Sequence, residues 1–317
     1  MDAQKTSAFS SNKKTLIQQF KKAWGKYWEI YILLIPLVVY YIIFAYYPMY
    51  GIQIAFRDFM PLKGITGSPW AGFKYFQRFI ESPYLWPILR NTIAISLYSL
   101  VVGFPLPILF ALLLNHLRSE RFKKTVQTVS YAPHFISTVV FVGMLKLMLS
   151  PETGVINLFL IALKLEPIYF FGRADLFYGL YVWSGVWQEL GWSAIIYVGA
   201  LAGINQELYE AAKIDGATIW HQIWHIDIPG ILPTITILLI MRAGSLLGVG
   251  YEKAYLMQNT MNSAMSEVIS TYTYKQGLLS AQHSYAAAVG LMNTVVNFVF
   301  LVLVNWIAGK TSDTSLF

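Results

Sequence analysis

Six stretches of the chain are long and apolar enough to cross a membrane as helices. A transmembrane helix needs about 20 consecutive, mostly apolar residues. Stretches that meet this requirement occupy approximately residues 29–47, 88–114, 126–149, 176–202, 231–249 and 284–307. Several of them contain proline or glycine, which membrane helices tolerate and which mark kinks. The pattern therefore predicts an all-α membrane protein with six transmembrane helices.

The composition supports this class of protein. Of the 317 residues, 56% are hydrophobic and 12% are charged, whereas a soluble domain has about 25% charged residues. So few charged residues argue against a disordered chain and against a soluble enzyme. The sequence has no cysteine, which excludes thiolate zinc sites, iron–sulfur clusters and a cysteine nucleophile. We do not expect a nucleic-acid partner, because the net charge of +7 is explained by basic residues flanking membrane helices.

The distribution of lysine and arginine predicts the orientation. Basic residues precede the first predicted span and fill the short connection after the second, which holds Arg118, Arg121, Lys123 and Lys124. Such residues favour the cytoplasmic side, so we expect both termini to be cytoplasmic. Residues 1–28 form a basic segment, either an amphipathic helix on the inner leaflet or a plain tail that fixes the topology.

The remaining chain divides into three parts. Residues 29–87 comprise the first span and a long outer segment that is rich in aromatic residues. That segment is either an interfacial belt or a docking surface. Residues 88–307 contain the other five spans, and residues 308–317 form a cytoplasmic tail.

The connection between the fourth and fifth spans, residues 206–229, has the most informative sequence. Residues 206–214 favour a helix, since they include two adjacent alanines. Gly216 then interrupts the helix, because glycine accepts a left-handed backbone conformation without a steric penalty. Thr218 can cap a second short helix, and we expect Pro229 to end it before the fifth span. A compact helix–turn–helix at this place can act as a lever that docks into a partner protein.

This segment resembles the EAA loop of the permease subunits of binding-protein-dependent ABC importers. The family pattern is E-A-A, three residues, G, nine residues and I-x-L-P. The chain has Glu210-Ala211-Ala212, then Gly216, then Ile226-Asp227-Ile228-Pro229, with isoleucine in place of the leucine. The pattern is extended by Asp215, Ala217 and Trp220, and in this extended form it resembles the carbohydrate branch of the family. Segments 48–56, 73–76, 90–92 and 250–253 are similar to oligosaccharide permeases of the aldouronate and alginate type.

The resemblance implies a type I importer permease fold in a bacterial cell membrane, surrounded by lipid. It implies a second homologous permease, two copies of a cytoplasmic ATPase and an extracytoplasmic solute-binding protein as partners, and an oligosaccharide as substrate. ATP and Mg²⁺ would be bound by the ATPase, so this chain would hold no cofactor and no catalytic residue. The chain accordingly lacks a GxxxxGK[ST] phosphate loop. The residues implied to couple to the ATPase are Glu210, Ala211, Ala212, Asp215 and Gly216.

Polar and aromatic residues inside the predicted spans are candidates for the substrate pathway. Ionisable groups within a membrane usually face a cavity or a partner. Aromatic rings and amides suit sugars, although the same side chains can serve helix packing. The candidates are Trp183, Trp187, Gln188, Glu189, Arg242 and Asn293. Glu189 and Arg242 lie at similar depth, so they can neutralise one another; alternatively, Arg242 or Lys146 binds a negatively charged substrate.

Other readings of the sequence remain open. The same architecture can import a non-sugar solute. A membrane enzyme acting on lipid-linked sugars would need surface carboxylates, and Glu207, Glu210, Asp215 and Asp227 are near one another in sequence. A proton-coupled secondary transporter would be expected to have inverted repeats, which we do not recognise. His221 and His225 are four residues apart, but we expect no metal site.

Overall fold

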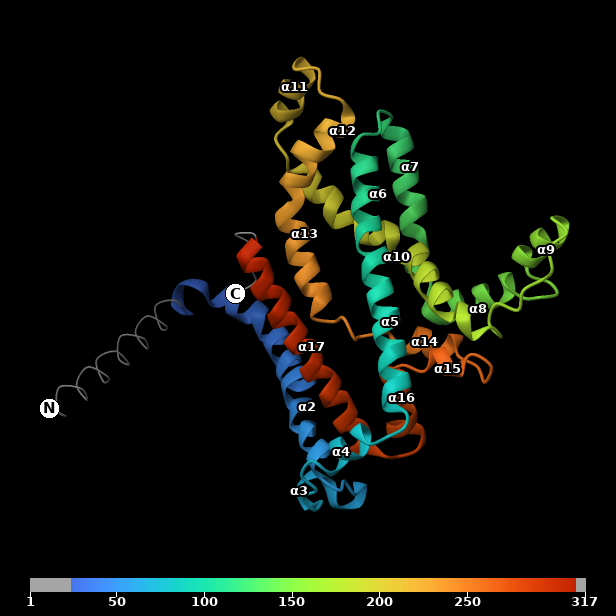
Figure 1. The fold of residues 1–317 in the computed structure, drawn as a ribbon. Coiled ribbons are helices and arrows are strands. Elements are labelled where there is room, and N and C mark those ends of the chain that lie inside the picture. Colours follow the sequence, from blue (N-terminus) through green and yellow to red (C-terminus); the bar gives the residue numbers. More distant parts are fainter. Residues whose placement is uncertain (1–23, 312–317) are drawn as a thin grey trace.

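The computed structural model describes residues 24–311, and helices joined by loops make up this part of the chain (Figure 1). Within this range the only strand-like pairing is an isolated antiparallel bridge between Arg57 and Trp70. The prediction of an all-α fold is therefore confirmed for the described residues. Most of the expected N-terminal basic segment and the end of the expected tail, residues 1–23 and 312–317, lie outside them.

Four helices are long and apolar enough to cross a membrane: Trp24–Phe56, Leu85–Asn115, Ile219–Ala243 and His283–Lys310. They overlap the first, second, fifth and sixth predicted spans. The first includes the segments η1 (Ile42–Tyr46), α2 (Tyr47–Met49) and η2 (Tyr50–Phe56), the second consists of α5 (Leu85–Gly103) and α6 (Pro105–Asn115), and the last belongs to α17 (His283–Thr311). None of the most apolar window of the first helix is buried, so its side chains require lipid or a partner protein around them.

The third predicted span is broken rather than straight. The chain forms α7 (Glu120–Tyr131), a short η4 (Ala132–Phe135) and α8 (Thr138–Met148), and the two longer parts are bent by 102°. Pro133 lacks an N–H group for the helix, and Ile136 and Ser137 have extended backbone angles. The prediction of one continuous helix over 126–149 was therefore wrong, and this pair makes a fifth span only if it is counted as one.

The fourth predicted span is the helix α10 (Phe177–Ala202), which has 26 residues. It is long enough to cross a membrane, but Gln188 and Glu189 interrupt its apolar sequence, and it is not among the four strongly apolar helices. It packs against α5, α6, α7 and α13 (Ile228–Ala243). This helix therefore contacts parts of the second, third and fifth predicted spans.

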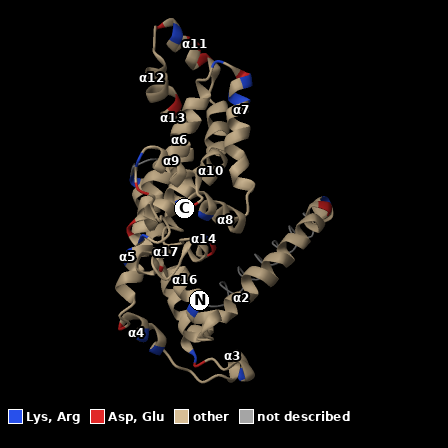
Figure 2. Ribbon diagram, turned by 90° about the vertical axis from the view of Figure 1, so that its right-hand side faces the viewer, with Lys and Arg blue, Asp and Glu red and all other residues tan. Residues whose placement is uncertain are grey.

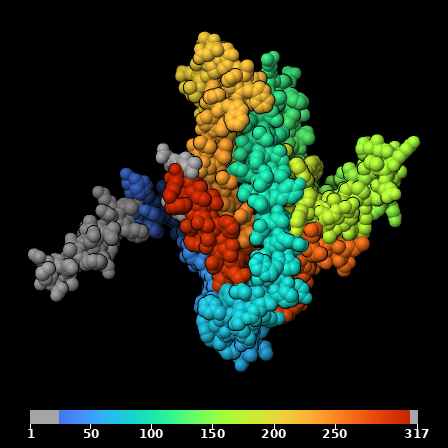
Figure 3. All heavy atoms as spheres, viewed as in Figure 1, coloured from blue at the N-terminus to red at the C-terminus, as the bar shows by residue number. Residues whose placement is uncertain are grey.

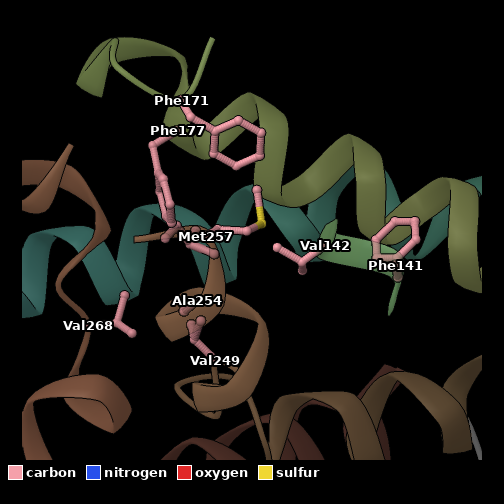
Figure 4. Packing of buried hydrophobic residues seen from close by; sticks show 9 residues of the cluster. Phe141, Val142, Phe171, Phe177, Val249, Ala254, Met257 and Val268 are labelled. Atoms are coloured by element: carbon pink, nitrogen blue, oxygen red, sulfur yellow. The ribbon is translucent and has the colours of Figure 1, made fainter. Parts of the chain in front are cut away.

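The buried core has separate clusters along α10. One surrounds Phe141, Phe177 and Met257 and joins α8 and α10 to α14 (Tyr251–Met257) (Figure 4). A second, farther along α10, includes Ala194 and Leu201 and joins α10 to α6 and α13. Polar residues lie between the two clusters, and they line the cavity described below.

Short helices connect these elements. They are η3 (Pro61–Lys63), α3 (Gly64–Gly67), α4 (Lys74–Ile80), α9 (Val155–Ala162), η5 (Ala174–Leu176), α11 (Gln206–Ile214), α12 (Ile219–Gln222), η6 (Ile223–Asp227), α15 (Ser263–Ser266), α16 (Ile269–Tyr274) and η7 (Lys275–Leu279). Many of the charged residues lie at the two ends of the molecule, near α7 and α11 at one end and near α3 and α4 at the other (Figure 2). Such a distribution is typical of a protein that crosses a membrane between those ends.

Candidate functional site: an exposed helix–turn–helix and a central cavity

The region of residues 206–229 projects at one end of the molecule (Figures 1 and 3). Its first helix, α11, matches the predicted range 206–214. The Asn205 side chain caps α11 by accepting a hydrogen bond from the Glu207 N–H at 3.1 Å. Glu210 and Ala211 are exposed, while Ala212 is half-buried. The exposed surface of the helix therefore places the small Ala211 side chain beside the Glu210 carboxylate, with Glu207 one turn earlier.

The turn after α11 depends on glycine. Gly216 has φ of +73°, a conformation that is costly for residues with a Cβ atom. The next residue, Ala217, donates its N–H to the carbonyl of Ala212 at 2.8 Å, as in the usual termination of a helix by a left-handed residue. Asp215 and Gly216 are exposed. The expected break at Gly216 is confirmed.

The second helix does not end at Pro229, contrary to the sequence-based expectation. Thr218 caps it by accepting a hydrogen bond from the His221 N–H, and α12, η6 and α13 then form one helix from Ile219 to Ala243. The segment η6 is a π-helical turn, in which the hydrogen-bonding register is shifted. Pro229 falls in the first turn of α13 directly after this shift, where a missing N–H is tolerated. The exposed turn is therefore connected without a break to a membrane helix.

The two histidines of this helix stack on one another and contact polar atoms of residues 218 and 221. The His221 and His225 rings are 6.1 Å apart. Their Nδ1 atoms contact the Thr218 hydroxyl at 2.7 Å and the His221 carbonyl at 3.0 Å. In the described part of the chain there is no group of three or more metal-binding side chains.

The central cavity has a volume of about 440 Å³ and lies between α5, α6, α8, α10, α13 and α14. Its charged residues are Glu189, Arg242 and Lys253. Two basic side chains and one carboxylate therefore face the same space. Of the pathway candidates, Gln188, Glu189 and Arg242 lie together here.

The other pathway candidates lie elsewhere. Trp183 and Trp187 are more than half exposed and do not line the cavity. The Trp183 indole donates a hydrogen bond to the Tyr98 hydroxyl at 2.7 Å, and Trp187 stacks on Phe141. Asn293 lines a separate hollow beside α16 and η7.

Lys253 is a cavity residue that the sequence analysis did not select. It follows the fifth span in the sequence, and α14 brings it back against α10. Its ammonium group donates to the Tyr181 carbonyl at 2.9 Å and lies 4.8 Å from the Tyr181 ring and 5.4 Å from that of Phe141. A Cβ atom at Gly185 would be 3.1 Å from the Lys253 Nζ, so glycine leaves room for the ammonium group. No periodicity in the sequence indicates this return of the chain.

Several membrane-length helices around a polar cavity, with an exposed helix–turn–helix at one end, define a subunit of a membrane transporter. The model of the family described as binding-protein-dependent transport system inner membrane component matches residues 103–313. The chain belongs to this family. This confirms the family resemblance that was inferred from residues 206–229.

Similar proteins are known from bacteria. Protein LplB of Bacillus subtilis (strain 168) is 41% identical over 91% of both chains. The polygalacturonan/rhamnogalacturonan transport system permease protein YteP of the same organism is 40% identical over 91% of this chain and 90% of that one. A crystal structure of a bacterial ABC transporter involved in the import of the acidic polysaccharide alginate contains a chain that is 38% identical, with a TM-score of 0.85, covering 93% of this chain and 99% of that chain.

Proposed function

We propose that the chain is one of two permease subunits of an ATP-driven importer for an oligosaccharide, in the cytoplasmic membrane of a bacterium. Of the similar proteins, YteP is named for polygalacturonan and rhamnogalacturonan transport, and the crystallised importer takes up the acidic polysaccharide alginate. More distant relatives are named for arabinooligosaccharides and for trehalose and maltose, so a saccharide is the substrate class that these names share. The observation that carries the proposal is the continuous helix that joins the exposed turn at Gly216 to Arg242 in the central cavity. In this arrangement the cavity forms half of the translocation pathway.

The six-span topology with cytoplasmic termini belongs to this proposal. The four apolar helices and the bent pair supply up to five crossings, and α10, with 26 residues, would be the sixth. The connection between α6 and α7, which contains Arg118, and the first turn of α7, which contains Arg121, lie at the same end of the molecule as α11 (Figures 1 and 2). The positive-inside rule therefore favours a cytoplasmic location for the 206–229 region, where it can contact the ATPase.

The partners follow from the same assignment. We infer a second homologous permease, two copies of a cytoplasmic ATPase that binds ATP and Mg²⁺, and an extracytoplasmic solute-binding protein. A second alginate importer structure, 37% identical, is a complex with an alginate pentasaccharide-bound periplasmic protein, which supports the last of these. The residues that would contact the ATPase are Glu210, Ala211, Ala212, Asp215 and Gly216. The chain itself would catalyse no reaction.

The charges of the cavity favour a substrate that carries carboxylates. Arg242 and Lys253 both line it, and hydrogen bonds between cationic side chains and carboxylates are among the strongest that proteins form. The cavity has one carboxylate, that of Glu189, and this carboxylate contacts His134 and not Arg242. A saccharide containing uronate residues would supply carboxylates that Arg242 can bind.

The test uses the importer reconstituted in liposomes with its ATPase and binding protein. We expect the loaded binding protein to stimulate ATP hydrolysis, and we expect a Glu210→Ala, Gly216→Pro double variant to lose this stimulation while it still assembles. A membrane enzyme would neither co-purify with an ATPase nor need one for activity. A secondary transporter would take up substrate without ATP, along a proton gradient.

A further inference from the structure

The exposed helix α11 is attached to the rest of the protein by one buried side chain. Tyr209 is 7% exposed, and it is the only buried residue of α11. Its ring lies at a steep angle to that of His116, with 6.5 Å between the ring centres. The orientation of the whole helix relative to the membrane helices therefore depends on what holds Tyr209.

Tyr209 is held by a carboxylate that is completely buried. Asp227 is 0% exposed and ends the π-helical turn η6 immediately before α13. Its Oδ1 atom accepts a hydrogen bond from the Tyr209 hydroxyl and another, at 3.4 Å, from the Asn115 amide. Its Oδ2 atom is 2.6 Å from the His116 Nε2 atom. Three segments thus meet at one carboxylate: α11, the end of α6 and the start of α13.

This arrangement specifies one geometry. A buried carboxylate is costly unless its hydrogen-bonding capacity is filled, so movement of α11 away from Asp227 would leave the charge insufficiently compensated. Burial raises the pKa of Tyr209, and the hydrogen bond to Asp227 and its negative charge raise that pKa further. The hydroxyl therefore stays protonated and remains a donor near neutral pH.

The two membrane helices that meet at Asp227 also line the central cavity. The helix α13 carries Arg242, and α6 contributes Pro107. A displacement of α11 that is transmitted through Asp227 would therefore reach two walls of the cavity.

We propose that Asp227 is a positioning residue that makes α11, α6 and α13 move as one body and so couples the exposed turn to the cavity. The inference rests on the proposed function, because it assumes that α11 contacts an ATPase. The residue acts through Tyr209 and His116, and it contacts neither substrate nor nucleotide.

The experiment compares Tyr209→Phe and Asp227→Asn with wild type in the reconstituted importer. The readouts are the recovery of the ATPase on purification, basal ATP hydrolysis, stimulation by loaded binding protein, and ATP consumed per substrate imported. We expect assembly and basal hydrolysis to be retained, stimulation to fall about fivefold or more, and the ATP cost per substrate to rise. The double variant should be no worse than the more severe single variant, since both remove the same contact.

Matched controls separate coupling from general destabilisation. Tyr197→Phe removes a hydroxyl from another buried tyrosine, and Asp175→Asn removes a carboxylate from an exposed ion pair with Arg173; both should behave as wild type. The inference is overturned if Tyr209→Phe, which retains the packed ring, keeps full stimulation and an unchanged ATP cost. It is also overturned if both variants lower stimulation only in proportion to lost assembly. If wild type itself neither assembles with an ATPase nor responds to the binding protein, the proposed function fails instead.

Discussion

The carboxylate of Glu189 is in hydrogen-bonding contact with the imidazole of His134, with 2.9 Å between Oε2 and Nδ1. This contact spans from α10 to the bend between α7 and α8, and the His134 ring also stacks on Trp192 at 4.2 Å. Arg242 has no ion pair among the described residues, although it lines the same cavity as Glu189. The expected neutralisation of Arg242 by Glu189 is thus not found, and its guanidinium group remains available to a ligand.

We therefore predict that Arg242→Gln selectively impairs the import of acidic oligosaccharides. A lost hydrogen bond to a charged group corresponds to about 1.5–3 kcal/mol, so uptake at limiting substrate should fall about tenfold or more. Arg242→Lys keeps the charge and should retain part of the uptake. The measurement is uptake of a uronate oligosaccharide and of a neutral one of equal length, each delivered by a binding protein that accepts it. Equal losses for both sugars would show that Arg242 serves the fold and not the carboxylate.

The sequence predicted the parts of the structure that depend on local pattern. The helices and the break at Gly216 follow from apolar runs, from alanine-rich stretches and from the conformational freedom of glycine. The position of a residue along a predicted span indicates its depth in the membrane but not the direction in which its side chain faces. For this reason the sequence did not predict that Glu189 contacts His134, or that Trp183 and Trp187 face away from the cavity. The π-helical turn and the contacts of Asp227 depend on packing between segments far apart in the chain, which periodicity does not encode.

The turn at Gly216 provides a second prediction. Nothing lies within 4 Å of a Cβ atom built there, so substitution acts through the backbone conformation and not through a clash. Gly216→Ala should cost about 1–2 kcal/mol in the local geometry and lower the stimulated ATP hydrolysis. Asparagine tolerates this conformation better, so Gly216→Asn should retain most of the stimulation. ATPase assays on the two variants at equal assembly test the prediction, and it is contradicted if alanine and asparagine behave alike.

The topology can be tested directly because the chain has no cysteine. A single cysteine in place of Arg121, at the α6–α7 end, should be cytoplasmic. One in place of Leu62, which is fully exposed at the opposite end, should face outwards. In intact cells a membrane-impermeant maleimide should label Leu62→Cys and leave Arg121→Cys unmodified until the membrane is opened. The reverse labelling pattern would invert the proposed orientation.

The outer segment contains an ion pair whose pH dependence can be predicted. Lys74 donates a hydrogen bond to Asp58 at 2.8 Å, and the Tyr75 hydroxyl donates another at 2.6 Å. Both hydrogen bonds lower the pKa of Asp58 below its ordinary value of 3.8, and the bond from Lys74 has the larger effect. A carboxylate with a lowered pKa stabilises the folded state above its ordinary pKa, and this contribution disappears as the pH falls through the lowered pKa.

Asp58→Asn should therefore lower the thermal stability of the purified protein slightly, since the pair is exposed. The difference from wild type should be constant from about pH 5 to 8, where the carboxylate is ionised whether the protein is folded or not. It should shrink only below pH 3.8, the ordinary value for this group. Thermal unfolding of both proteins across this range measures the difference, with Asp175→Asn as a control for an exposed pair elsewhere. A difference that already disappears between pH 5 and 8 would mean that another group controls this contact.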